Sequence, residues 1–236
     1  METISSKATI KQLVAAALHA LQHSGREIFV TSLHDTLLKK KVKFPLLEYA
    51  AREIAAAVPD EEQTSILDDI ICLRETGSQV LAGTVLQLRL DRHFAASIDK
   101  ACAYIQYGDQ WYVCDIIGER VLGHALLTRP EETIPLLQQL SAHENKWMVR
   151  TVGVAAHYAV KKGLSPVFVE PVFNMLLSLS DATDFHTRKG IGWGAKTVAK
   201  FHPELIARYH PRIESAATRQ WFRTKINMGL HYSRKK

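Results

Sequence analysis

The stretch GDQWYVCDIIGERVLG, residues 108–123, contains a tryptophan and an aspartate four positions apart, Trp111 and Asp115. Residues at this spacing lie on one face of a helix, so a ring and a carboxylate would stand side by side. A carboxylate in a poorly hydrated cleft stabilises developing positive charge, and an aromatic face attracts cations. Taken alone, the pair is read more simply as a half-buried tryptophan beside a solvated aspartate.

A second group lies in FHTRKGIGWGAKTVAKFHPEL, residues 185–205. In a helix that starts near Asp184, one face would carry the residues at i, i+4, i+7 and i+11, which are Lys189, Trp193, Lys196 and Lys200. A separate face would carry the apolar residues. This spacing predicts an aromatic side chain on a basic surface rather than in the core.

The same helix contains three glycines around Trp193, at Gly190, Gly192 and Gly194. Each glycine inside a helix costs about 1 kcal/mol relative to alanine. We therefore expect them to thin the helix so that a neighbouring helix or a ligand backbone can come close. The string GIGWGA is not a dinucleotide-binding fingerprint, because a polar and charged segment precedes it where that motif requires a strand.

A third group is ENKWMVRTVGVAAH, in which Arg150 follows Trp147 by three residues. By itself this segment indicates an ordinary amphipathic helix. The eleven histidines show no spacing typical of metal ligands, and we expect no metal and no cofactor.

The elements that must position these residues are helices, since apolar residues recur with helical spacing and strand alternation is absent. In the N-terminal part, the apolar stripe from Ile10 to Leu21 indicates a helix, and further helices are expected from Pro45 and from Asp60. A break at Gly77 precedes apolar runs over 79–90 and 94–106. Later helices are expected over 109–127, 130–140, 145–162, 166–179, 184–201 and 203–209, and near 215–230. Short helices in pairs, with boundaries at Pro130, Pro166 and Pro203, predict an all-α fold, a curved α-solenoid of HEAT-like repeats forming one domain over 1–236.

The charge is unevenly distributed along the chain. Residues 1–140 contain 14 Lys and Arg against 18 Asp and Glu, a net charge of −4, so residues 141–236 hold the remaining 16 and 6, a net charge of +10. A basic half favours a polyanionic partner, although a solvated basic surface explains the same numbers. No apolar run is long enough for a membrane helix, and three cysteines without a CxxC pair are expected to be reduced core thiols in a cytoplasmic protein.

Together, the W-x-x-x-D helix, the W-M-x-R segment and the K-G-I-G-W segment resemble, in order and spacing, the AlkD-type DNA alkylation repair proteins. These are HEAT-like DNA glycosylases that excise N3- and N7-alkylpurines. The resemblance runs from about Pro45 to the C-terminus, is sharpest over 109–200 and is weakest over 1–44. It implies that Asp115 is the catalytic aspartate, that Trp111 and Trp193 flank the lesion, and that Arg150 contacts the DNA backbone. Two departures from the family are Lys196, where relatives tend to have arginine, and the glycines at 190 and 194.

The resemblance further implies excision of cationic alkylpurines from duplex DNA, without base flipping, as a step of base excision repair. Arg188, Lys189, Lys196 and Lys200 are expected to bind the DNA beside Arg150, on a basic concave face. The protein is expected to act as a monomer. Two alternatives remain open: a non-catalytic helical-repeat scaffold that binds DNA or RNA, and a protein–protein adaptor with exposed apolar stripes.

Overall fold

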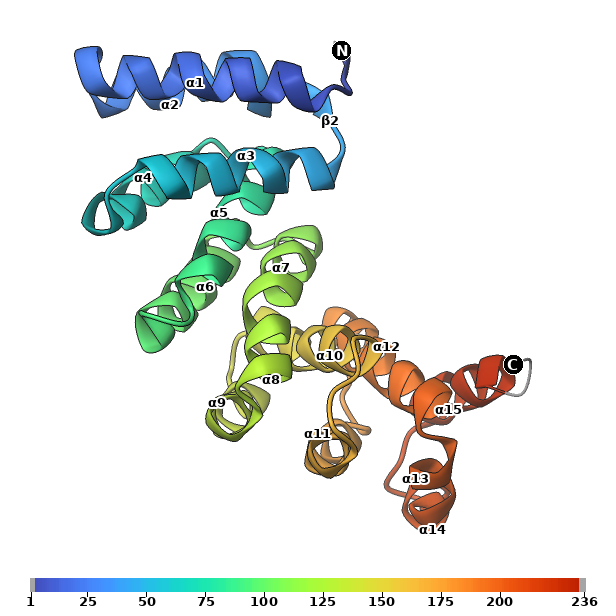
Figure 1. Cartoon of the computed structure of the whole chain (residues 1–236). Helices are drawn as coiled ribbons and strands as arrows, with labels where there is room; N and C mark the ends of the chain where they lie inside the picture. Colours follow the sequence, from blue (N-terminus) through green and yellow to red (C-terminus); the bar gives the residue numbers. More distant parts are fainter. Residues whose placement is uncertain (1–2, 234–236) are drawn as a thin grey trace. The chain divides into compact units, whose positions relative to one another are not determined.

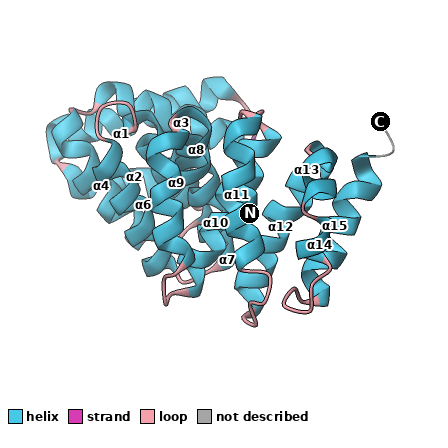
Figure 2. Ribbon diagram, turned by 90° about the horizontal axis from the view of Figure 1, so that it is seen from below, coloured by secondary structure: helices cyan, strands magenta, loops and turns pink. Residues whose placement is uncertain are grey.

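The computed structural model describes residues 3–233, which divide after Lys100 into two compact units. Helices joined by short loops make up almost all of the described chain (Figure 2). The expected all-α helical-repeat class is therefore confirmed. The single domain, the curvature and the basic concave face stay predictions.

The N-terminal unit is built from helices that follow one another closely along the chain (Figure 1). They are α1 (Lys7–Ser24), α2 (Arg26–Leu33), the π-helix η1 (His34–Leu38), α3 (Phe44–Ala57), α4 (Asp60–Cys72), α5 (Thr76–Arg89) and the first part of α6 (Phe94–Gly108). Fully buried side chains such as Phe29, Leu33 and Leu37 form its core. The helix expected from the Ile10–Leu21 stripe is α1, and the helix starts expected at Pro45 and Asp60 are confirmed.

Two expectations for this unit are wrong. Gly77 does not break a helix, because α4 ends at Cys72 and Gly77 is the second residue of α5. The sequence also indicated no strand, yet β1 (Thr3–Ile4) pairs in parallel with β2 (Lys41–Val42). Two residues per strand are too few to show an alternating pattern, which explains why periodicity does not reveal this pair.

The C-terminal unit contains the helices expected to carry the site. They are α7 (Trp111–Gly118), the π-helix η2 (Glu119–Gly123), α8 (His124–Thr128), α9 (Pro130–Ser141), α10 (Lys146–Lys161), α11 (Pro166–Ser178), α12 (Phe185–Phe201), α13 (Pro203–Arg208), α14 (His210–Ile213) and α15 (Gln220–Ser233). Pro130, Pro166 and Pro203 each stand first in a helix, as predicted. The π-helical turn η2 continues α7 without a break and leads into α8.

Helix α10 is the centre of this unit. It is buried along most of its length and contacts α7, η2, α8 and α9 as well as α12, and α12 also packs against α15. The side chain of Asn145 caps its start by accepting a hydrogen bond from the Trp147 amide at 2.8 Å. Helix α10 thus brings together residues from the α7–α8 segment, from α9 and from α12.

The α12 glycines serve helix packing. A Cβ atom at Gly190 would lie 2.6 Å from the carbonyl oxygen of Arg150, and one at Gly194 would lie 2.8 Å from that of Gly153. Gly192 instead faces the side chain of Lys225 on α15, at 2.9 Å. Of the two reasons considered for these glycines, the structure therefore supports close approach of a neighbouring helix.

The three cysteines are free, but only Cys114 is buried; Cys102 is half-buried and Cys72 is exposed. The expectation that all three are core thiols is wrong for Cys72, which ends α4. Within residues 3–233, no helix is both long enough and apolar enough to span a membrane.

Candidate active site

Asp115 on α7 and Arg150 on α10 form a two-point ion pair. The Nε and Nη2 atoms of Arg150 donate to Oδ1 and Oδ2 of Asp115, both at 2.8 Å. The Arg150 side chain is 7% exposed and that of Asp115 is 17% exposed, so the carboxylate is the more accessible end of the pair. Such a fork holds the carboxylate in one orientation.

The Arg150 guanidinium is itself fixed by α12. Its Nη1 atom donates to the carbonyl oxygen of His186 at 3.0 Å, next to the Trp147 ring, which lies 4.5 Å from the His186 ring between centroids. Trp147 is buried and donates through its indole N–H to the carboxylate of Asp109. Asp109 has a left-handed backbone (φ 45°) immediately before α7. Trp147 therefore has a structural position, tying α10 to the turn from which α7 starts.

Cys114, the neighbour of Asp115, is not a candidate nucleophile. Its thiol is buried and lies 3.1 Å from the hydroxyl of Thr151. Burial raises the pKa of the Cys114 thiol to about 12, so it is protonated at neutral pH.

A second contact with α10 comes from η2, which continues α7. Glu119 follows Asp115 by four residues, and its Oε1 atom is 4.0 Å from Nε2 of His157 on α10. Nδ1 of His157 is 2.7 Å from the hydroxyl of Thr197, and the imidazole stacks on the Trp193 ring with 3.9 Å between centroids. Burial lowers the pKa of His157 to about 4, with Lys161 and Lys196 acting in the same direction. Burial raises the pKa of Glu119.

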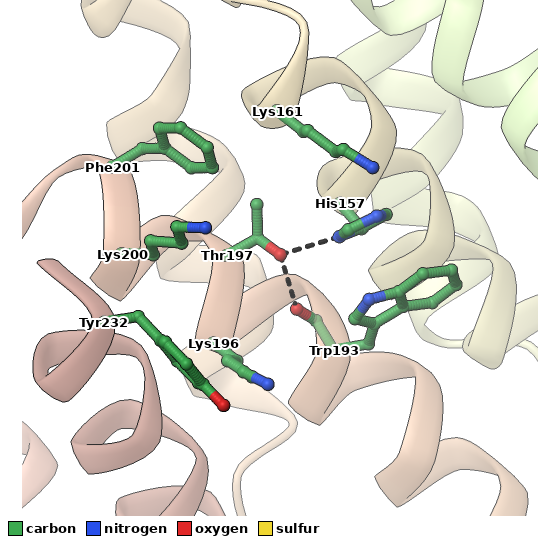
Figure 3. Close-up of a pocket in the computed structure, with 8 residues that line it drawn as sticks. All are labelled: His157, Lys161, Trp193, Lys196, Thr197, Lys200, Phe201 and Tyr232. Atoms are coloured by element: carbon green, nitrogen blue, oxygen red, sulfur yellow. Dashed lines mark hydrogen bonds between the residues drawn. The ribbon is translucent and has the colours of Figure 1, made fainter.

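Trp193 is half-buried and forms one wall of a pocket that we call the lysine pocket, with a volume of about 270 Å³ (Figure 3). Its lining residues come from α10, α12 and α15: His157, Lys161, Trp193, Lys196, Thr197, Lys200, Phe201 and Tyr232. The Nζ atoms of Lys196 and Lys200 lie 5.0 and 5.9 Å from the centre of the Tyr232 ring. Among the described residues, no carboxylate pairs with these two lysines. The predicted aromatic side chain on a basic surface is thus present at Trp193.

The other predicted DNA-binding residues of α12 lie outside the pocket lining. Lys189 is exposed, with its Nζ atom 5.2 Å from the centre of the Phe185 ring. Arg188 faces α15, where its guanidinium lies 5.7 Å from the centre of the Trp221 ring. Lys225 on α15 has a lowered pKa because of burial and of the nearby charges of Lys189 and Lys196. A cation-rich surface of this kind favours an anion.

Trp111 begins α7 and is 53% exposed, with its ring edge-on to that of Tyr112. It shares a helix face with Asp115, as its spacing predicted. The structure therefore brings Asp115 and Arg150 into direct contact, places Trp193 with Lys196 and Lys200, and leaves the Trp111 ring exposed at the start of α7.

The sequence reasoning missed Glu119, His157, Thr197, Lys161 and Tyr232. Continuing the helix face of Trp111 and Asp115 by one turn reaches Glu119, and spacing of the same kind leads from Arg150 to His157 and Lys161. The histidines show no metal-ligand spacing, and nothing in the sequence distinguishes His157 from histidines at the surface or at helix caps. No pattern in the sequence indicates that Tyr232 belongs to this pocket.

The structure defines an all-helical repeat protein with a clamped carboxylate, exposed tryptophan and basic–aromatic pocket in its C-terminal unit. Residues 40–224, more than half of the chain, match the family model described as DNA alkylation repair enzyme. The chain belongs to this family, and its role lies in the repair of alkylated DNA. Comparison with curated proteins and with solved structures found no match.

Proposed function

We propose that this protein is a DNA glycosylase that removes cationic N3- and N7-alkylated purines from duplex DNA, without base flipping, in base excision repair. The observation that carries the proposal is the Asp115 carboxylate, held by Arg150 and aligned on one helix face with the exposed ring of Trp111. Family membership supplies the context, and the chemistry of the site supports the particular reaction.

The reaction suits a site with a clamped carboxylate. Cleavage of an N-glycosidic bond passes through a transition state with positive charge on the sugar, which a fixed carboxylate stabilises. An N3- or N7-alkylated purine is already cationic, so it departs as a neutral base and needs no acid. Arg150 holds Asp115 in place, while the carboxylate remains the more exposed end of the pair. The Asp115 carboxylate is thus proposed to face the sugar.

DNA binding is assigned to the lysines of α12 and to Arg150. Lys189, Lys196 and Lys200 make no ion pair within the described part of the chain, so they are available to phosphates. A guanidinium has five N–H donors, and Arg150 uses three on Asp115 and His186. A remaining donor of Arg150 is proposed to contact the DNA backbone beside the lesion. Arg188, against Trp221, is proposed to contribute charge at longer range.

Trp111 and Trp193 are proposed to hold the lesion nucleotide against Asp115. Each ring contact with a cationic base or with the sugar cation is worth about 0.5–2 kcal/mol. Trp193 is backed by the stacked ring of His157, which restricts its orientation. The exposure of Trp111 leaves its ring free to contact DNA held in the duplex.

A non-catalytic scaffold that binds DNA is the alternative. It requires the lysine pocket and would leave the Asp115–Arg150 pair with a structural role alone, linking α7 to α10. A protein–protein adaptor is disfavoured by the exposed aromatic residues near the site, since Phe185, Phe201 and Tyr232 each lie beside a lysine rather than in an apolar stripe.

The test is to incubate the protein with methylated duplex DNA and identify the released bases by chromatography. We expect 7-methylguanine and 3-methyladenine to be released and uracil to be retained in a uracil-containing duplex. Tight binding of the duplex with no base released would instead favour the scaffold.

A further inference from the structure

Glu119 is a second carboxylate on the helix face of Asp115. It stands at i+4 from Asp115, where α7 passes into the π-helical turn η2, and the Glu119 amide donates to the Asp115 carbonyl. Its side chain is 31% exposed, so it is reached from solvent but is partly dehydrated. The two carboxylates therefore face the same neighbour, α10, one turn apart.

The two carboxylates differ in what surrounds them. Each oxygen of Asp115 accepts a hydrogen bond from Arg150, so its lone pairs are partly occupied. Glu119 accepts no hydrogen bond within 3.5 Å from the described residues, and its nearest basic group is His157 at 4.0 Å. Glu119 is consequently the carboxylate with oxygens free to bind a water molecule.

The hydrogen bonds of His157 show which nitrogen faces Glu119. The Thr197 hydroxyl donates to the carbonyl oxygen of Trp193 at 3.0 Å, so it accepts from Nδ1–H of His157 at 2.7 Å (Figure 3). In the neutral ring Nδ1 then carries the proton, and Nε2 turns a lone pair towards Glu119. Burial favours this neutral form, since the pKa of His157 is lowered to about 4. Nε2 is thereby a proton acceptor that lies 4.0 Å from the Glu119 carboxylate.

We propose that Glu119 is a catalytic residue, the general base that takes a proton from the attacking water, with His157 as the positioning residue behind it. The inference rests on the proposed glycosylase function and adds a division of work between the two carboxylates. Asp115 stabilises the sugar cation, and Glu119 activates the water.

The hydrolysis transfers one proton from water to Glu119. The glycosidic bond breaks with its electron pair going to the cationic base, which leaves neutral, and the positive charge passes to the sugar. A water oxygen bonds to C1′ while one of its O–H bonds breaks, and that proton moves to an oxygen of Glu119. The protonated carboxyl then donates towards Nε2 of His157 until the proton is released to solvent. The DNA is left with an abasic sugar.

The charges around Glu119 suit a base of this kind. Burial raises its pKa, the nearby Asp115 acts in the same direction, and Arg120, Lys161 and Lys162 oppose them. A base works best when its pKa approaches the working pH, because it then holds the abstracted proton more firmly. Since only ionised Glu119 accepts a proton, activity should fall as the pH is lowered through this pKa.

The experiment measures single-turnover release of 7-methylguanine from duplex DNA at saturating protein between pH 5 and 9. Saturating protein separates the chemical step from DNA affinity, which removal of a negative charge would raise. E119Q should slow release by about 10²-fold, at the low end for a positioned base. The wild-type rate should fall as the pH is lowered through the pKa of Glu119, and this fall should be absent from E119Q. E131Q is the matched control, since it removes an exposed carboxylate on α9, and it should match the wild type.

Hypoxanthine, a neutral base, provides the second arm. A residue that serves only as a base gives no excision of hypoxanthine, and this result would support the proposal. Excision of hypoxanthine that quickens as the pH falls, and that E119Q abolishes, would show Glu119 to be an acid and would overturn it. So would an E119Q rate equal to that of the wild type. A wild type that releases no 7-methylguanine overturns the glycosylase function itself, and the two failures are therefore distinguishable.

Discussion

Asp115 and Arg150 lie 35 residues apart in the chain and are joined by two hydrogen bonds of 2.8 Å each. The pair links α7 to α10, and the third bond of Arg150, to the His186 carbonyl, extends the link to α12. Because the guanidinium is almost fully buried, any change at Asp115 affects both the proposed chemistry and the stability of the fold.

Asp115→Asn should reduce excision of 7-methylguanine by about 10²–10³-fold, the effect of removing one key electrostatic group. Asparagine retains one oxygen for Arg150 but leaves the buried guanidinium without a counter-charge, so the free energy of unfolding should also decrease. Single-turnover release and urea denaturation measure the two effects. DNA affinity should stay equal or rise slightly, because a negative charge near the phosphates is removed. Release at the wild-type rate would contradict the proposed role of Asp115.

Replacing the α12 glycines by alanine should give opposite results at neighbouring positions. Gly190→Ala brings a methyl group against the Arg150 backbone, which cannot move aside, and should destabilise the protein by about 1–3 kcal/mol. Gly192→Ala meets only the flexible side chain of Lys225, so the better helix propensity of alanine, about 1 kcal/mol, should make it neutral or stabilising. Chemical denaturation of both variants checks this. Equal destabilisation of the two would show that helix contact is not the reason for Gly190.

Lys196→Ala combined with Lys200→Ala should weaken the salt dependence of duplex binding. Each phosphate that the protein no longer neutralises reduces the magnitude of the slope of log affinity against log salt by about 0.9. The slope should therefore become shallower by up to about two units. Fluorescence anisotropy over a range of salt concentrations measures it. Lys11→Ala with Lys43→Ala removes two exposed lysines of the N-terminal unit and should leave the slope nearly unchanged. If both double variants behave like the wild type, the lysine pocket does not touch DNA.

His157 should make the protein less stable in mild acid. Its pKa is lowered in the folded state from 6.5 to about 4, so the unfolded chain binds the proton more readily. The stability that neutral His157 contributes is present above pH 6.5 and is lost as the pH falls towards 4. His157→Phe keeps a ring on Trp193 without a titrating group, and the decrease in unfolding free energy between pH 7 and 4.5 should be smaller in this variant. The raised pKa of Glu119 makes the folded state more stable as the pH falls. Glu119 is present in both proteins, so it does not account for the difference between them.

Most of the helices could be predicted from the sequence because helical periodicity is a local property, but α2, η1 and α14 were not expected. The stripe of Trp193, Lys196 and Lys200 is of this kind, since all three residues belong to one helix and its rotation per residue sets their common face. The helix starts at Pro130, Pro166 and Pro203 are equally local, because proline favours the first turn. The pair of two-residue strands is too short to give any such signal.

The sequence by itself thus determined the all-α class, the family and the single-helix faces that carry Trp111, Asp115 and Trp193. Only the tertiary structure decided that Asp115 meets Arg150, that Glu119 faces His157, and that Tyr232 of α15 joins the lysine pocket. The physical reason is that contacts between helices depend on how closely and at what rotation the helices pack. Here that packing depends on the absence of side chains at Gly153, Gly190 and Gly194, where α10 and α12 touch backbone to backbone.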